Sequence, residues 1–422
     1  MDIRASVSAP RSGLPGRSQR SMATQIDPVP GSGTALLCLM VFANTVCVGA
    51  FGPLLPEIAR AQGLADWQLG LLAGSFGFAR MIADVPTGLI AGRRLGTSLA
   101  IAPGLLVAGV LLLWSAGPFA VLVLGRVLIG LGHSFGMVAG LTAILLDRRG
   151  AAGSMRLNVF EFAGMAGVLG GLAGIALLPA AWGWPRSLVV AGSPVLITVL
   201  LVPRLRRQFP DQPRASAGDG SRAVAAPAPA GRTPRMVWLM FAVGIIMGLA
   251  WSSVSQFLIP LRATREFGLD RAGVSQLLGL AQVVDLLALL PVGWLADRLG
   301  RVFMLSAVSA CLGLGALAVG LGSFPFVVAG CALLGVGMAG WMFPLGVIRE
   351  HTESRLFAWR TGLYRVGVDA EAFLGPVVCG FIGEAHTGLF VSAVGMSAFA
   401  ASIGLGRRAF RAGAAEGTPG SP

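Results

Sequence analysis

The chain has 422 residues, of which 55% are hydrophobic and only 12% are charged, and its formal net charge is +13. A water-soluble protein of this length would lack the polar residues to cover its surface, so the composition excludes a soluble fold. In a soluble protein this positive charge would indicate nucleic-acid binding. Here the basic residues lie mainly between apolar runs, and we expect no nucleic-acid partner.

The first 33 residues carry no apolar core. Their basic residues stand among Pro, Ser and Gly and are Arg4, Arg11, Arg17 and Arg20. This composition predicts a disordered cytoplasmic tail rather than a signal peptide, which needs an apolar stretch.

Apolar runs of about 20 residues, each long enough to cross a hydrocarbon core of roughly 30 Å, then follow one another along the chain. Lipid offers no hydrogen-bond partner to a free backbone group, so each run is predicted to be a helix. The first six predicted spans are 34–56, 68–91, 97–116, 119–142, 157–178 and 186–203. The second six are 236–260, 272–296, 302–321, 324–347, 359–382 and 387–406.

Residues 204–235 lie between the two sets. They are rich in Pro, Ala, Gly and Arg, a composition that cannot form a hydrophobic core and that predicts a flexible cytoplasmic linker. Residues 407–422 are predicted to be a cytoplasmic tail. The predicted fold is therefore an all-α membrane protein with 12 transmembrane helices in two pseudo-symmetric six-helix bundles, 34–203 and 236–406.

The distribution of arginine predicts the orientation of the chain. If the N-terminus is cytoplasmic, the tails, the linker and the loops on that side hold 24 Arg. The opposite side holds five, namely Arg60, Arg186, Arg262, Arg265 and Arg271. Since cytoplasmic loops carry the excess of basic residues, both termini are predicted to be cytoplasmic.

The two sets of spans are related by an internal repeat with an offset of 205 residues. Pro86 and Gly88 match Pro291 and Gly293, Gly130 and Gly132 match Gly335 and Gly337, Gly63 matches Gly268, and Gly170 matches Gly375. One offset that holds at four places predicts a parallel duplication. Two such halves enclose a polar cleft and expose it to either side alternately.

The loop after the eighth span carries the most specific motif. It reads Gly293-Trp294-Leu295-Ala296-Asp297-Arg298-Leu299-Gly300-Arg301, which resembles the G-x-L-x-D-R-x-G-R signature of the major facilitator superfamily. In the equivalent first-half loop Gly92 stands where the family usually has Asp. The resemblance implies a conformational latch for the inward-closed state, formed by Gly88, Arg93, Gly293, Asp297, Arg298 and Arg301.

Two further motifs extend the resemblance to nearly the whole chain apart from the tails and linker. In the fourth span, Arg126, Gly130 and Gly132 resemble the family's R-x-x-x-G-x-G pattern, whose Arg the family associates with proton coupling. In the fifth span, the glycines from Gly164 to Gly171 resemble the antiporter motif, but Ala166-Gly167 replaces its usual Gly-Pro pair.

Charged side chains inside the spans are the best functional candidates, because an ionised group near the bilayer centre costs about 2.5–3.5 kcal/mol. Arg80 and Asp84 are spaced i, i+4 and can pair within one helix. By the offset, however, Arg80 corresponds to Asp285. We therefore also hypothesise that Arg80 meets a second-half carboxylate, Asp369 or Asp285, in one access state.

The remaining candidates each have a structural and a functional interpretation. Arg126 either bridges helices or faces a cavity and holds an anionic group there, and His133 is either a hydrogen-bonded core residue or a proton relay. Arg365 is again spaced i, i+4 from Asp369, and Glu161 lies in the fifth span. Asp285 and Asp369 are the predicted proton carriers, the alternative being that they lock helices together.

Together, the residues and the resemblance predict a secondary active transporter that moves a small organic solute by alternating access with coupling to protons. We expect a monomeric multi-pass protein of a bacterial cytoplasmic (inner) membrane. Buried arginines would suit uptake of an organic anion and buried acids would suit export of amphiphilic compounds, so both directions stay open. A uniporter or a transporter-like sensor without proton coupling is the alternative. We expect no enzyme activity, cofactor or metal site, because the chain has no nucleotide-binding loop, no HExxH and no paired Cys/His ligands.

Overall fold

The computed structural model describes residues 31–146, 153–211 and 233–416. The predicted tail before residue 31 and most of the predicted linker, residues 212–232, lie outside this part of the chain. The residues that are described fold into helices and short connections, without a strand.

In the described residues, the chain of the first half runs from one end of the bundle to the other six times, and we call each passage a crossing. Its first crossing is α1, the short 3₁₀ helix η1 and α2 in succession, and its sixth is α7 followed by α8. The helices are α1 (Gly31–Gly49), η1 (Gly52–Leu54), α2 (Leu55–Gln62), α3 (Asp66–Ala91), α4 (Leu95–Trp114), α5 (Phe119–Leu146), α6 (Gly153–Leu177), α7 (Trp184–Gly192) and α8 (Val195–Gln208).

The second half repeats the six crossings. Its first crossing contains a π-helical turn, η2, and its fourth is α13 followed by α14. The helices are α9 (Arg235–Ser253), η2 (Val254–Leu258), α10 (Ile259–Arg265), α11 (Arg271–Leu299), α12 (Arg301–Leu321), α13 (Phe324–Met338), α14 (Phe343–Glu350), α15 (Ser354–Ile382) and α16 (Glu384–Glu416).

Every predicted span contains a helix, but several predicted spans end before the helix does, including the last span of each half. The last helix of the first half continues past residue 203 to Gln208, and the last helix of the second half continues past residue 406 to Glu416. Hydropathy cannot detect these turns because they are polar. Arg206 and Arg207 occupy the last turn of α8, where cations interact favourably with the helix dipole.

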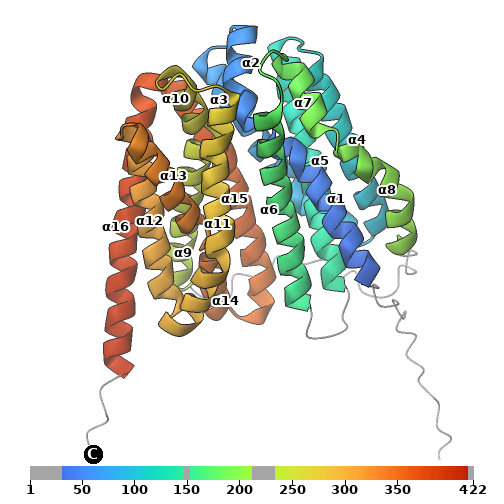
Figure 1. Cartoon of the computed structure of the whole chain (residues 1–422). Helices are drawn as coiled ribbons and strands as arrows, with labels where there is room; N and C mark the ends of the chain where they lie inside the picture. Colours follow the sequence, from blue (N-terminus) through green and yellow to red (C-terminus); the bar gives the residue numbers. More distant parts are fainter. Residues whose placement is uncertain (1–30, 147–152, 212–232, 417–422) are drawn as a thin grey trace, which may run out of the picture.

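The two halves stand side by side, with α1 and α4–α8 toward the right and α9–α16 toward the left of Figure 1, and α2 and α3 at the top between them. Helix α1 begins and α16 ends at the same end of the bundle, the lower end in Figure 1. We call it the terminal end, and we call the opposite end, where α2, α7 and α10 lie, the distal end. Both termini of the helical bundle therefore leave from one side.

Ten crossings are long and apolar enough to span a membrane by length and hydropathy. The other two, α3 and α15, are as long as the rest but carry the charged residues Arg80, Asp84, Arg365, Asp369 and Glu371. These two helices pack against each other between the halves. The least apolar crossings thus form the larger contact between the two bundles, beside that of α6 with α11. Their charges can be shielded from lipid there.

The packing repeats with the offset found in the sequence. A Cβ added at Gly130 of α5 would lie 2.6 Å from the Cβ of Ala79 in α3. A Cβ added at Gly335 of α13 would lie 2.9 Å from the Cβ of Val284 in α11. Both members of the second pair are 205 residues after those of the first, so the same close helix approach, which requires glycine, occurs in both halves.

The start of the linker is fixed to the first half by Asp211. Its Oδ1 accepts a hydrogen bond of 2.9 Å from the backbone N–H of Thr97, and its Oδ2 accepts one from the Thr97 hydroxyl. Partial burial acts to raise the pKa of Asp211, but the hydrogen bonds from Thr97 outweigh it and hold the pKa below its usual range. Asp211 thus caps the first turn of α4.

We expect Asp211→Ala to lower the thermal unfolding midpoint of the detergent-solubilised protein at pH 7, because capping bonds contribute about 0.5–2 kcal/mol and an exposed one falls at the low end. A carboxyl group with a depressed pKa stabilises the folded protein at pH values above its unfolded-state pKa, and this stabilisation is lost as the pH falls. The difference in midpoint between the wild type and Asp211→Ala should therefore shrink below about pH 4. Thr97→Val, which keeps the backbone bond, should show a smaller effect. An unfolding midpoint of Asp211→Ala equal to that of the wild type at pH 7 would contradict the capping role.

Candidate functional site

The contact between α3 and α15 is tightest toward the distal end. A Cβ added at Gly74 would lie 2.6 Å from the backbone oxygen of Phe373, and one added at Gly77 would lie 2.6 Å from the backbone nitrogen of Phe373. One turn nearer the distal end, Gly70 lies against Gly380 in the same way. The missing side chains let the two backbones touch, which closes the interface between the halves at the distal end.

Arg271 ties the two halves together at this closed end. Its Nε lies 2.8 Å from Oε1 of Glu57 in α2, and its two Nη atoms donate to the Ser187 hydroxyl and to the carbonyls of Ala180 and Trp182. Its side chain is 4% exposed. Each acceptor belongs to the first half, whereas Arg271 begins α11 in the second half.

A second ion pair supports the same contact. Arg265 at the end of α10 lies 2.9 Å from Asp66 at the start of α3. From the sequence, Arg265 and Arg271 were predicted only as loop charges, and Glu57 and Asp66 were not predicted as functional residues. A signal was present, because the 205-residue offset relates Glu57 to Arg262 and Asp66 to Arg271, so the distal rims carry acids in the first half and bases in the second.

At mid-depth, two further ion pairs cross the interface in opposite directions. Arg80 of α3 lies 2.7 Å from Asp369 of α15, and Arg365 of α15 lies 3.5 Å from Asp84 of α3. Asp84 also accepts a hydrogen bond from the Ser134 hydroxyl. The i, i+4 spacings within α3 and α15 therefore accompany pairs between the halves, and none of the described ion pairs joins Arg80 to Asp84 within α3.

Glu161 and His133 lie next to these four charges. Glu161 of α6 is half-buried and interacts electrostatically with Arg365 and with Arg80. His133 of α5 interacts with the same two arginines, and its ring packs 5.3 Å from that of Phe76. Two helices of the first half, α3 and α6, and one of the second, α15, thus contribute to one group of charged residues. We call it the central cluster, and it consists of Arg80, Asp84, Glu161, Arg365 and Asp369.

Arg126 lies inside the first half and makes no described ion pair with the central cluster, although it shares the Phe76 ring with Arg80. Its guanidinium stacks 3.7 Å from the ring centre of Phe51 and 5.0 Å from that of Phe76. The residue is 4% exposed, and its Nε and Nη1 have no hydrogen-bond partner in the described structure. Cation–π contacts to two rings hold the charge away from lipid.

The second half buries two more acids. Asp285 of α11 is 4% exposed and accepts a hydrogen bond of 3.2 Å from Gln282, and it does not reach Arg80. Glu371 of α15 is 3% exposed and fills the space beside Gly248 of α9, where an added Cβ would overlap its carboxyl group. Of the two carboxylates proposed as partners of Arg80, the structure pairs Asp369.

The residues of the family motif lie at the terminal end. Arg93, Asp297, Arg298 and Arg301 are exposed, while Gly88 and Gly293 are half-buried. Arg301 pairs with Glu350 of its own half at 2.7 Å, and Arg298 stacks 3.8 Å from the ring centre of Trp294. Among the described ion pairs, none ties this motif to the first half. The latch therefore stays a prediction, and the end that is closed in this arrangement is the distal one.

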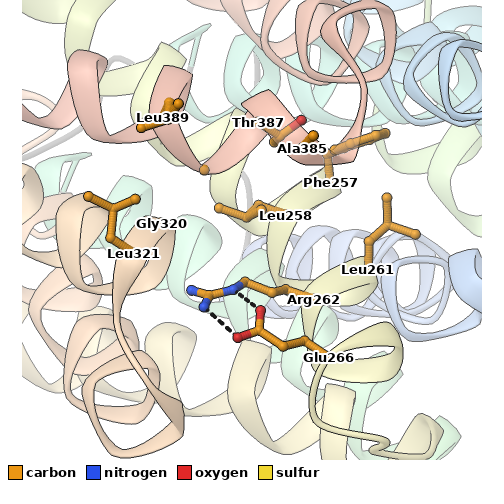
Figure 2. Close-up of a pocket in the computed structure, with 11 residues that line it drawn as sticks. Phe257, Leu258, Leu261, Arg262, Glu266, Gly320, Leu321, Ala385, Thr387 and Leu389 are labelled. Carbon is orange, nitrogen blue, oxygen red and sulfur yellow. Dashed lines mark hydrogen bonds and ion pairs between the residues drawn. The ribbon is translucent and has the colours of Figure 1, made fainter.

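A cavity of about 230 Å³ lies at the distal end, inside the second half. Figure 2 shows it between α10, the end of α12 and the start of α16, with Arg262 paired to Glu266 at one side and apolar walls from Leu258, Leu261, Leu321 and Leu389. It contains no residue of the first half and none of the central cluster. It is therefore separate from the interface where the candidate site lies.

Comparison with known proteins identifies relatives of the whole chain. The family model described as Major Facilitator Superfamily matches residues 37–263 and again residues 240–419. No curated protein matches the sequence.

Solved structures match in fold. A bacterial homolog of the human lysosomal transporter Spinster, inward-facing and unoccupied, shares 15% identity, with 91% of this chain and 93% of that chain covered and a TM-score of 0.67. The peptide transporter POT in complex with alafosfalin shares 12% identity over 90% and 94%, with a TM-score of 0.70. The nucleoside transporter NupG shares 14% identity over 90% and 99%, with a TM-score of 0.69.

Proposed function

Since this chain belongs to the Major Facilitator Superfamily of transporters, we propose that it is a secondary active transporter that carries a small organic solute by alternating access, coupled to protons. The observation that carries the proposal is the pair of ion pairs between α3 and α15, Arg80 with Asp369 and Arg365 with Asp84. These pairs join the two bodies that alternating access moves relative to each other.

The arrangement of the two halves supports an inward-facing state. With both termini in the cytoplasm, as the arginine distribution predicts, the distal end faces away from the cytoplasm. The contacts of Arg271 with Glu57 and of Arg265 with Asp66 then close the outer side. In this state the solute reaches the central cluster from the cytoplasmic side. The membrane we propose is the bacterial inner membrane, with the protein working as a monomer.

Proton coupling follows from the cost of separating the ion pairs. When the halves rock, Asp369, which is 1% exposed, must leave Arg80 or carry it along. A buried carboxylate without a cation costs several kcal/mol, so a carboxyl group that loses its partner is stable only after it takes up a proton. Asp369 is thus the proposed proton carrier, and Asp285 and Glu371, buried without a cationic partner among the described residues, are available as further carriers.

The test uses the purified protein in vesicles that contain a pH-sensitive dye. A thermal-shift screen against organic acids, amines, zwitterions and sugars first identifies a stabilising solute, and that solute is then added outside the vesicles. We expect a change of internal pH that follows solute movement. Solute movement without a pH change would refute proton coupling and favour the uniporter, while binding without movement would favour a sensor.

A further inference from the structure

Two groups of the central cluster retain unused charge. Arg80 lies 2.7 Å from Asp369, and Asp84 accepts a hydrogen bond from the Ser134 hydroxyl. Arg365, in contrast, lies 3.5 Å from Asp84, and its side chain is 42% exposed. Glu161 makes no ion pair or hydrogen bond with another side chain in the described part of the chain. One cation is held loosely and one anion is not paired at all.

These two groups come from opposite sides of the interface between the halves. Glu161 belongs to α6 in the first half and Arg365 to α15 in the second. They interact electrostatically, yet they do not come within ion-pair distance. A charge within a membrane span is stable only against water or a polar partner, and the Arg365 side chain, 42% exposed, requires one of these.

Open space lies beside Arg365. Gly362 lies three residues before it, on the same face of α15, and a Cβ added at Gly362 would meet no atom within 4 Å. Toward the distal end the same helix is tightly packed, since Gly74 and Gly77 of α3 touch its backbone. The open part of the interface therefore begins at the level of Arg365.

We propose that the solute is a zwitterion whose ammonium group binds Glu161 and whose carboxylate binds Arg365. This assignment rests on the proposed function and names its substrate class. A guanidinium donates two parallel hydrogen bonds to a carboxylate, which lets the solute compete with the long contact to Asp84. A solute with only a positive charge would leave Arg365 as it is, and one with only a negative charge would leave Glu161 unpaired.

A zwitterion also explains how binding promotes rocking. Its two charged groups would bind one residue of each half, and so replace the ion pair that is absent on the open side. A ligand promotes closure around itself only if it binds the arrangement in which both halves contact it better than the present arrangement, which is open at the terminal end. A solute that must touch both halves to satisfy both charges has this property.

The test compares three probes with one carbon skeleton: leucine, leucine methyl ester and N-acetylleucine. Binding to the full-length protein in detergent is measured at pH 7 by thermal shift and by calorimetry. A second series of zwitterions, from leucine to 5-aminopentanoate and to dileucine, varies the separation of the two charges. We expect at least one zwitterion to bind tenfold or more tightly than its singly charged analogues.

Two variants assign the groups. Glu161→Gln should abolish the preference for the zwitterion over the N-acetyl analogue, and Arg365→Gln should abolish its preference over the ester. Glu266→Gln, in the distal cavity, is the matched control and should retain both preferences. Equal binding of the three analogues, or no binding by any zwitterion of the series, would overturn the assignment.

The outcome is separable from that for proton coupling. If a zwitterion binds with these preferences but crosses vesicles without a pH change, the substrate class stands and the coupling is refuted. If a singly charged solute moves with protons while no zwitterion binds, the coupling stands and the substrate class is refuted.

Discussion

Arg271→Ala is expected to open the distal end and to shift the protein toward the outward-open arrangement. Arg271 is the most completely satisfied charge between the halves, since Glu57, Ser187 and the carbonyls of Ala180 and Trp182 all accept from it. All of these contacts are lost together when the side chain is removed. In the outward-open arrangement these contacts between the halves are already broken, so Arg271→Ala destabilises that arrangement much less.

The expected size follows from the cost of breaking a buried pair. Removing one partner of such a pair costs about 3–5 kcal/mol, and we expect the lower end because the Glu57 side chain is 26% exposed. At 1.4 kcal/mol for each factor of ten, this corresponds to roughly a hundredfold shift in the ratio of the two arrangements. Transport should slow to a similar degree, since one half of the cycle becomes unfavourable.

The measurement is the reaction of an introduced cysteine with a membrane-impermeant maleimide added outside. Leu54→Cys reports on the distal end because Leu54 is fully buried there, and the five native cysteines are first replaced by serine or alanine. Labelling should increase strongly in Arg271→Ala. Arg262→Ala is the control, because Arg262 lies at the same end but binds only Glu266, Val319 and Gly322 of its own half.

Exchanging the charges should then restore closure. Glu57→Arg combined with Arg271→Glu keeps one ion pair and gives up the hydrogen bonds to Ser187 and the two carbonyls, so a partial return to low labelling is expected. Unchanged labelling in Arg271→Ala would show that the glycine contacts of α3 and α15 close the distal end without it.

Asp369→Asn is expected to abolish proton-coupled transport, with a loss of at least a hundredfold, while solute binding persists. The substitution removes the proposed proton carrier and leaves Arg80 without the carboxylate 2.7 Å away. An unpaired arginine at this depth costs about 3 kcal/mol or more. Solute-driven pH change in vesicles measures the coupling, and thermal shift with the same solute measures binding.

Charge exchange tests whether the pairing itself matters. Arg80→Asp with Asp369→Arg preserves the ion pair between the halves, and we expect it to recover part of the transport that either single variant loses. Arg80→Asp with Asp285→Arg should recover nothing, because Asp285 lies away from Arg80 inside the second half. Absence of rescue by the first combination would refute a role for the pair in the transport cycle.

Features that depend on neighbouring residues could be predicted from the sequence alone. The crossings, their duplication with an offset of 205 residues and the family motif at Gly293–Arg301 are local patterns, since hydropathy over about 20 residues and the spacing of glycines determine them. The list of charged candidates followed from the same principle, because an ionised residue inside an apolar run is costly wherever the helix lies.

Which charge meets which was decided only by the tertiary structure. Arg80 pairs with Asp369 rather than with Asp285, its equivalent by the repeat, and Arg271 turned out to be a buried link rather than a loop charge. These partners lie far apart in the sequence and on different halves. Their meeting depends on how each helix is rotated about its axis and on which end of the bundle is closed, and no local pattern encodes either of these.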